Sequence, residues 1–76
     1  MDDLTRDAVA RGMLLQAAEF GLSDIAATAM LQGAAFGEIN KAAVRRHMEY
    51  LAGDGKSYIS INKTNPNIWQ VSLRRD

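Results

Sequence analysis

The chain contains no cysteine, one proline and no long apolar run. Without thiols it cannot form disulfide crosslinks or thiolate metal sites, and this fits an intracellular setting. No stretch approaches the roughly 18 consecutive apolar residues of a membrane-spanning helix, so we expect no membrane partner. Residues 1–6 are acidic and lack the basic start and apolar centre of a signal peptide. The sequence therefore predicts a cytoplasmic protein.

The chain is also poor in groups that carry out catalysis. Its single histidine, His47, would need at least two carboxylate partners from elsewhere to define a zinc site. No glycine-flanked nucleophile turn and no phosphate-binding loop are present. We therefore expect no enzyme activity, no cofactor and no metal site.

What the chain does contain is typical of one small globular domain spanning residues 1–76. Hydrophobic residues make up 47% of it and charged residues 24%, which argues against disorder. A chain of this length buries only roughly 60% of its unfolded surface. We therefore expect modest stability, or stabilisation by a partner.

The charges are unevenly distributed although they sum to zero. Residues 1–38 carry two arginines against six carboxylates, a net charge of −4. Residues 39–76 carry seven cations against three carboxylates, a net charge of +4. A local field, rather than the sum, decides where a polyanion docks. This asymmetry favours a polyanion site in the second half, although charges on a solvated surface can also fall this way.

A first helix is predicted from about Leu4 or Thr5 to Phe20, and Gly21 can end it because glycine tolerates a left-handed backbone. The apolar residues of this helix spread over two opposite sides, whereas a surface helix of a monomer usually has one apolar stripe. The second stripe could pack under the strands of the same chain or meet another subunit. It provides a candidate homodimer surface formed by Leu4, Ala8, Leu15 and Ala18.

A second helix is predicted to begin at the cap residue Ser23, with Asp24 in its first turn, where a carboxylate complements the helix dipole. It should extend toward Ala35 or Phe36, and Gly37 can end it. The absence of charge over residues 25–37 is typical of a helix packed between others.

The third helix is the best-defined element of the sequence. Asn40 is a strong N-cap residue, because its side-chain oxygen can accept from free backbone amides. Ile39 and Val44 match a hydrophobic staple around that cap. Val44, Met48 and Leu51 follow helical spacing and should face inward, and the opposite side carries Lys41, Ala42, Arg45 and Glu49.

After the third helix the hydrophobic period changes to two over residues 57–61 and 68–73, which predicts two strands. Residues 62–67 are rich in turn formers and are expected to form the loop of a β-hairpin. A hairpin needs an apolar face that packs on the helices, supplied here by Ile59, Ile61, Trp69, Val71 and Leu73. Three helices followed by a two-stranded hairpin predict an α+β winged helix-turn-helix fold.

Residues 41–55 resemble the recognition-helix segment of ArsR-type transcriptional repressors. The shared features are a valine, an arginine–histidine pair, an aliphatic residue, a leucine and a glycine before the wing: Val44, Arg46, His47, Met48, Leu51 and Gly53. The metal-sensing cysteines and the terminal dimerisation helices of that family have no counterpart. In size and helix spacing the chain is similar to small winged-helix proteins of Mu-like phages.

This resemblance implies a small DNA-binding transcription regulator whose third helix enters the major groove. Arginine can donate two hydrogen bonds to guanine, and lysine contacts phosphate. The expected DNA-binding residues are Lys41, Ala42, Arg45 and Arg46 in the helix, and Lys63 in the 62–67 wing. Two alternatives stay open: these cations are solvated surface charges, or the fold serves protein–protein contact without DNA, which zero net charge favours.

Overall fold

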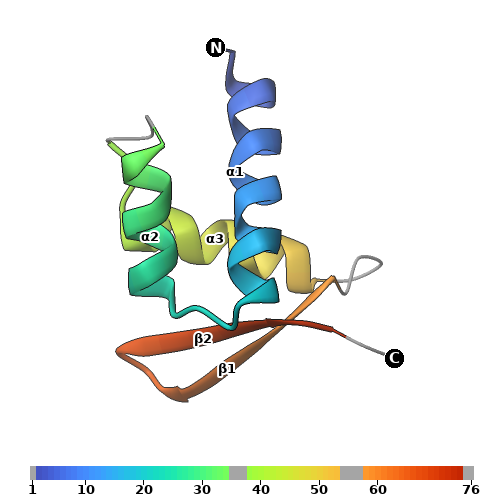
Figure 1. The fold of residues 1–76 in the computed structure, drawn as a ribbon, viewed down its shortest axis with the longest axis vertical. Helices are drawn as coiled ribbons and strands as arrows, with labels where there is room; N and C mark the ends of the chain where they lie inside the picture. Colours follow the sequence, from blue (N-terminus) through green and yellow to red (C-terminus); the bar gives the residue numbers. More distant parts are fainter. Residues whose placement is uncertain (1, 35–37, 54–57, 75–76) are drawn as a thin grey trace.

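A computed structural model describes residues 2–34, 38–53 and 58–74. In chain order its elements are α1 (Asp3–Glu19), α2 (Asp24–Gly33), α3 (Lys41–Ala52), β1 (Ile59–Asn65) and β2 (Ile68–Leu73), shown in Figure 1. This is the predicted α+β winged helix-turn-helix arrangement, with the β1–β2 hairpin as the wing. The predicted end of the second helix, residues 35–37, lies outside the described residues.

Each helix begins at a side chain that caps its free amides. Ser23 Oγ accepts a hydrogen bond from the Ala26 amide at 3.1 Å, and Asn40 Oδ1 accepts from the Ala43 amide at 2.9 Å. Both caps were predicted, because short polar side chains at these positions replace missing intrahelical partners. The cap of α1 is Asp2, so α1 begins slightly earlier than the sequence indicated.

The predicted end of α1 at Gly21 is confirmed. Gly21 has a φ of +66°, in the left-handed region. Its amide donates to the Ala18 carbonyl at 3.1 Å, and the Leu22 amide donates to the Ala17 carbonyl at 3.0 Å. This pair of bonds is a Schellman motif, which satisfies carbonyls at the helix end and turns the chain toward α2.

The hydrophobic core lies where the three helices meet the hairpin. The predicted inward residues of α3, Val44, Met48 and Leu51, are all buried in it. The apolar face of the hairpin is also confirmed, with Ile59 and Val71 buried and the other three predicted members packed against the core. The remaining buried hydrophobic residues are Ala10, Leu14, Ala17, Ala18, Ala27, Leu31 and Ile39.

The two apolar sides predicted for α1 do not exist as separate stripes. Of the four candidate dimer residues, Ala18 is buried in the core and Leu15 is packed against it. Leu4, by contrast, is 84% exposed, and Ala8 is exposed too. The four residues therefore do not form one free surface, because the core of the same chain covers the C-terminal part of the stripe.

The prediction of a loop over residues 62–67 is wrong. β1 continues through Asn65, and the turn consists of Pro66 and Asn67 alone. The antiparallel register is irregular between Asn62 and Asn65. Turn-forming residues can continue a strand here because this part of the hairpin is exposed, so backbone pairing does not require an alternating apolar pattern.

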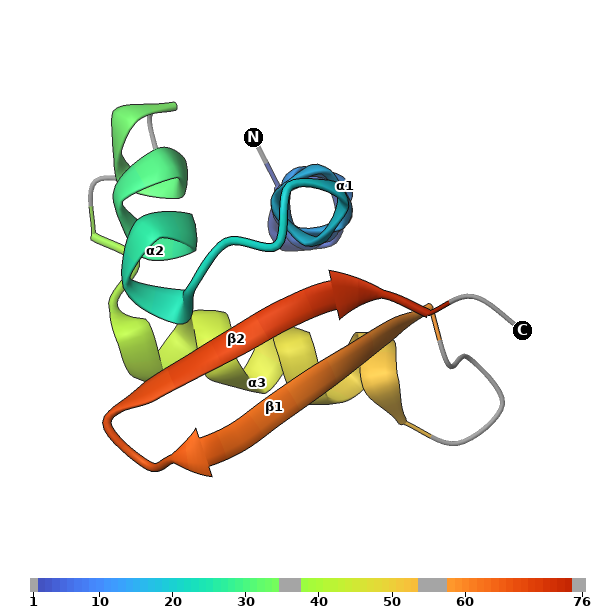
Figure 2. The same ribbon diagram turned by 60° about the horizontal axis from the view of Figure 1, so that its bottom comes forward.

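A short backbone contact joins the hairpin to the α1–α2 turn. Ser23 forms an isolated antiparallel bridge with Gln70, and the Val71 amide donates to the Leu22 carbonyl at 3.1 Å. Figure 2 shows β2 between this turn and β1, with α3 running behind the hairpin. The turn between α1 and α2 therefore holds β2 in place through backbone contacts. Within the described residues, no helix combines the length and apolar character needed to cross a membrane.

Candidate nucleic-acid interface

The outward face of α3 differs in part from the predicted one. Its exposed residues are Ala42, Arg46, Glu49 and Tyr50. The side chains of Lys41 and Arg45 are partly covered, and both contact the hairpin. The helix therefore presents one edge to the wing, and residues of its other edge line a groove with α1.

Arg45, expected to face DNA, is partly covered and is bonded to other parts of the chain. Its Nε donates to Oδ2 of Asp24 at 2.6 Å, and its Nη2 donates to the Pro66 carbonyl at 3.1 Å. Its guanidinium carbon lies 4.3 Å from the centre of the Trp69 ring. The side chain keeps 21% of its surface exposed, and these three contacts leave it poorly placed to reach a base. The sequence did not predict this arrangement, because helical spacing alone does not show which side of a helix another element will cover.

Lys41 also points toward the hairpin turn. Its Nζ lies 3.3 Å from the Asn67 carbonyl oxygen, a weak hydrogen bond at the surface. Because Arg45 bonds the preceding carbonyl, two successive carbonyls of the turn accept from α3. The first half of α3 and the tip of the wing consequently lie side by side.

Lys63 was expected near the tip of a loop, but it lies within β1. Its ammonium group forms an ion pair with Glu49 of α3 and sits 4.6 Å from the centre of the Trp69 ring. Trp69 is only half-buried and packs against the core, as its strand phase predicted. Its ring thus contacts two cations from different elements, Arg45 and Lys63.

The exposed end of the hairpin carries uncharged polar groups. Asn62 Oδ1 accepts from the Thr64 amide and Asn65 Oδ1 accepts from the Asn67 amide, each at 2.9 Å. These local bonds fix the two asparagine carbonyl groups and leave their amide NH₂ groups as donors. The sequence predicted that the wing asparagines support Lys63 at a phosphate, but it did not show that local bonds hold Asn62 and Asn65 in place.

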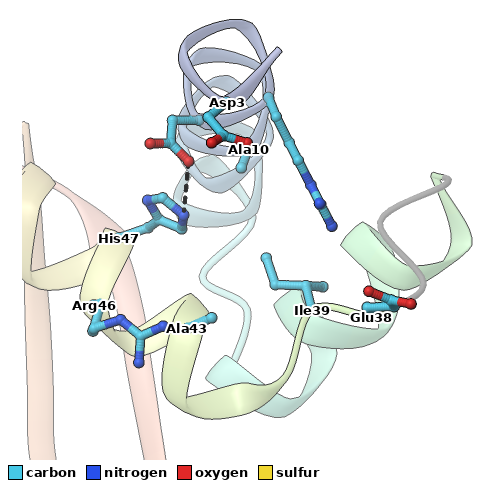
Figure 3. A pocket seen from close by; sticks show the side chains of 9 residues that line it. Asp3, Ala10, Glu38, Ile39, Ala43, Arg46 and His47 are labelled. Carbon is cyan, nitrogen blue, oxygen red and sulfur yellow. Dashed lines mark ion pairs between the residues drawn. The ribbon is translucent and has the colours of Figure 1, made fainter. Parts of the chain in front are cut away.

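On its other edge, α3 forms a groove of about 460 Å³ with α1 and the segment before α3. Figure 3 shows His47 and Arg46 of α3 on one side of this groove, and Glu38 and Ile39 on another. His47 Nε2 lies 3.8 Å from Oδ1 of Asp7. Burial lowers the pKa of His47 below its ordinary value of 6.5, and the Asp7 carboxylate partly opposes this shift.

Within residues 2–34, 38–53 and 58–74, no group of three or more histidine and carboxylate side chains is arranged to hold a metal ion. Comparisons of this chain with protein-family models, with curated proteins and with solved structures found no match.

Proposed function

We propose that this chain binds double-stranded DNA as a small transcription regulator or architectural protein in the cytoplasm, with α3 in the major groove and the wing on the adjoining backbone. The observation that carries this proposal is the pairing of α3 with the turn of the wing. Lys41 and Arg45 donate to the carbonyls of Asn67 and Pro66. These bonds join a helix end and a hairpin tip into one surface, and a helix and a β-ribbon are the two elements that enter DNA grooves.

The exposed side chains of this surface suit a polyanion. Arg46 is exposed and can donate to a base edge or phosphate, and Lys41, which is partly covered, lies at the start of α3 on the edge that meets the wing. Ala42 is small enough for close approach and can contact a thymine methyl group. The wing adds neutral donors that contact sugar and phosphate, namely Asn62, Thr64, Asn65 and Asn67.

The charge of the surface is modest. Two of the expected cations are paired within the molecule, Arg45 with Asp24 and Lys63 with Glu49. In the described part of the chain, no carboxylate pairs with Lys41 or Arg46. Neutralisation of two phosphates gives a salt slope of about −1.8. We therefore expect weak non-specific binding, with most of the discrimination coming from base contacts.

The proposal is tested by selecting sequences from a random double-stranded library at low salt and measuring affinity by fluorescence anisotropy. Arg46→Ala should weaken binding roughly 5- to 150-fold, the range for a good arginine–base contact, and reduce the salt slope by about 0.9. Arg74→Ala removes the same charge at the opposite end of the hairpin and should change affinity little. Failure of the library to yield any salt-dependent binder would rule out the DNA function.

A second candidate is a winged-helix module for protein–protein contact. It is favoured by large apolar residues that remain exposed near the α1–α2 turn, Phe20 at 76% and Ile25 at 51%. A partner bound there would be lost with Phe20→Ser and retained with Arg46→Ala. DNA binding should show the reverse pattern.

A further inference from the structure

Asp24 is the least expected charged residue of the fold. It is the first residue of α2 and is completely buried. Its Oδ2 is bonded to Arg45, whereas its Oδ1 has no hydrogen-bond partner among the described residues. Carboxylates are almost never fully buried unless they are paired. The helix N-terminus favours its negative charge, and among residues 2–34, 38–53 and 58–74 its partner for a charge-assisted bond is Arg45.

Arg45 in turn contacts α2, the turn of the hairpin and β2 through one guanidinium group. Nε donates to Asp24 of α2, Nη2 donates to the Pro66 carbonyl of the turn, and the guanidinium carbon lies over the Trp69 ring of β2. A guanidinium can do this because its donors lie in a rigid fork and its faces stack on aromatic rings. A lysine at the same position would have one ammonium group and could not make all three contacts.

We propose that Asp24 and Arg45 form a wing latch, in which Arg45 is a positioning residue for the wing and Asp24 is its buried anchor. The latch holds the turn Pro66–Asn67 at a fixed position relative to α3. It therefore sets the distance between the two elements that contact DNA, the helix and the wing. This inference rests on the DNA-binding function proposed above. It assigns Arg45 an effect on DNA affinity through the wing rather than through contact with DNA.

Substitution of Asp24 shows whether Arg45 positions the wing or contacts DNA, because the two roles predict opposite changes in DNA affinity. Asp24→Asn removes the negative charge that holds Arg45 and replaces a charge-assisted hydrogen bond by a weaker neutral acceptor. If Arg45 were a DNA-contacting residue, this change would leave affinity unchanged or raise it. A latch requires affinity to fall, and we expect at least a tenfold loss even though Asp24 itself is inaccessible to DNA.

The salt slope provides a second distinction. Arg45→Gln should lower affinity at least tenfold while leaving the slope unchanged, since no phosphate or base loses a cation. Arg46→Gln is the matched control, and it should lower the slope by about 0.9. Arg45→Lys should bind DNA as weakly as Arg45→Gln, because an ammonium group lacks the fork of guanidinium donors that bonds both Asp24 and Pro66. A wild-type affinity for Arg45→Lys, or a reduced slope for Arg45→Gln, would overturn the positioning role.

The latch is also measurable without DNA. Trp69 is the only tryptophan, so its emission reports directly on the site. In Asp24→Asn and Arg45→Gln we expect a shifted emission maximum and at least tenfold faster exchange of the hairpin amides in β1 and β2. The amide of Leu14 in α1 should keep its exchange rate. Uniform acceleration of all amides, or none, would overturn the latch.

Measuring both DNA affinity and amide exchange distinguishes failure of the DNA-binding proposal from failure of the latch. If the wild-type protein binds no DNA but the hairpin amides respond as expected, the DNA function fails and the latch survives as a structural feature. If the wild-type protein binds DNA and Asp24→Asn binds it equally well or better, the positioning role fails and the DNA function stands.

Discussion

The carboxylate of Glu49 in α3 is paired with the ammonium of Lys63 in β1, across the boundary between the helix and the wing. Both side chains are about half exposed, 50% and 49%. An exposed pair of this kind contributes roughly 0–1 kcal/mol to stability. The pair has a larger effect on the charge that this surface presents to DNA. Glu49 is the one carboxylate on the outward face of α3, and it neutralises Lys63 of the wing.

Removal of that carboxylate should strengthen DNA binding. Glu49→Gln frees Lys63 and raises the charge of the surface by one unit, so affinity should rise several-fold and the salt slope should steepen by about 0.9. Anisotropy titrations at several salt concentrations measure both quantities. Glu19→Gln on α1 is the charge-matched control. Equal affinities for the wild type and Glu49→Gln would show that this edge of α3 does not approach DNA.

Two glycines of the same helical region should respond to alanine with opposite signs. Gly12 lies inside α1 with open space around the position of a Cβ atom, so Gly12→Ala should stabilise the fold by about 1 kcal/mol. Gly21 has a φ of +66°, which costs other residues roughly 1–2 kcal/mol. Gly21→Ala should therefore destabilise by that amount. Urea denaturation of the two variants provides the comparison, and the same sign for both would contradict the described end of α1.

His47 should make stability depend on pH. Burial lowers its pKa below 6.5, the nearby arginines Arg11 and Arg46 add to this, and Asp7 opposes it. The unfolded chain then binds the proton at a higher pH than the folded chain. The free energy contributed by neutral His47 is complete above about pH 6.5 and decreases as pH falls through the folded pKa. Asp3, Arg6 and Glu38 line the same groove.

Titration of the imidazole by NMR should give a midpoint below 6.5 for the wild type and a still lower one for Asp7→Asn. Denaturation between pH 5 and pH 7.5 should show a smaller pH dependence for His47→Gln than for the wild type. A wild-type midpoint above 6.5 would mean that the ion pair with Asp7 outweighs burial.

Homodimerisation through α1 stays a prediction, but its surface cannot include Ala18, which is buried in the core, or Leu15, which packs against it. Leu4 at 84%, Val9 at 40% and Phe20 at 76% exposure are the large apolar residues of the α1 region available to another subunit. Light scattering at tens of micromolar should give twice the 8.3 kDa chain mass. Phe20→Ser should return the protein to a monomer, and Leu15→Ala should not do so selectively. A wild-type mass of one chain would exclude the dimer under these conditions.

The sequence predicted those parts of the fold that depend on local chemistry. Ser23 and Asn40 cap helices because of their own side chains, and Gly21 ends one because of its own backbone. The inward stripe of α3 follows from spacing alone. Each of these features requires only residues within a few positions of each other.

Features that depend on contacts distant in sequence were missed. Arg45 and Asp24 are 21 residues apart, and nothing in either segment shows that they meet. Asp24 was taken as an ordinary first-turn acid, and Arg45 lies at the boundary between the outward and inward sides of its helix. The one available signal was Trp69, a large aromatic residue in a strand that packs beside α3 and could cover a neighbouring cation.

The two-residue turn at Pro66–Asn67 sets a limit on how the wing can be lengthened. Adding two residues to each strand keeps Ile61 and Val71 facing the core, because side chains alternate with a period of two. It also carries the turn roughly 7 Å farther along the hairpin, at about 3.3 Å per residue. Arg45 could not follow it. Homologues or designs with longer wings would therefore need a different attachment for the tip, because Asp24 and Arg45 would stay paired without a bond from Arg45 to the turn.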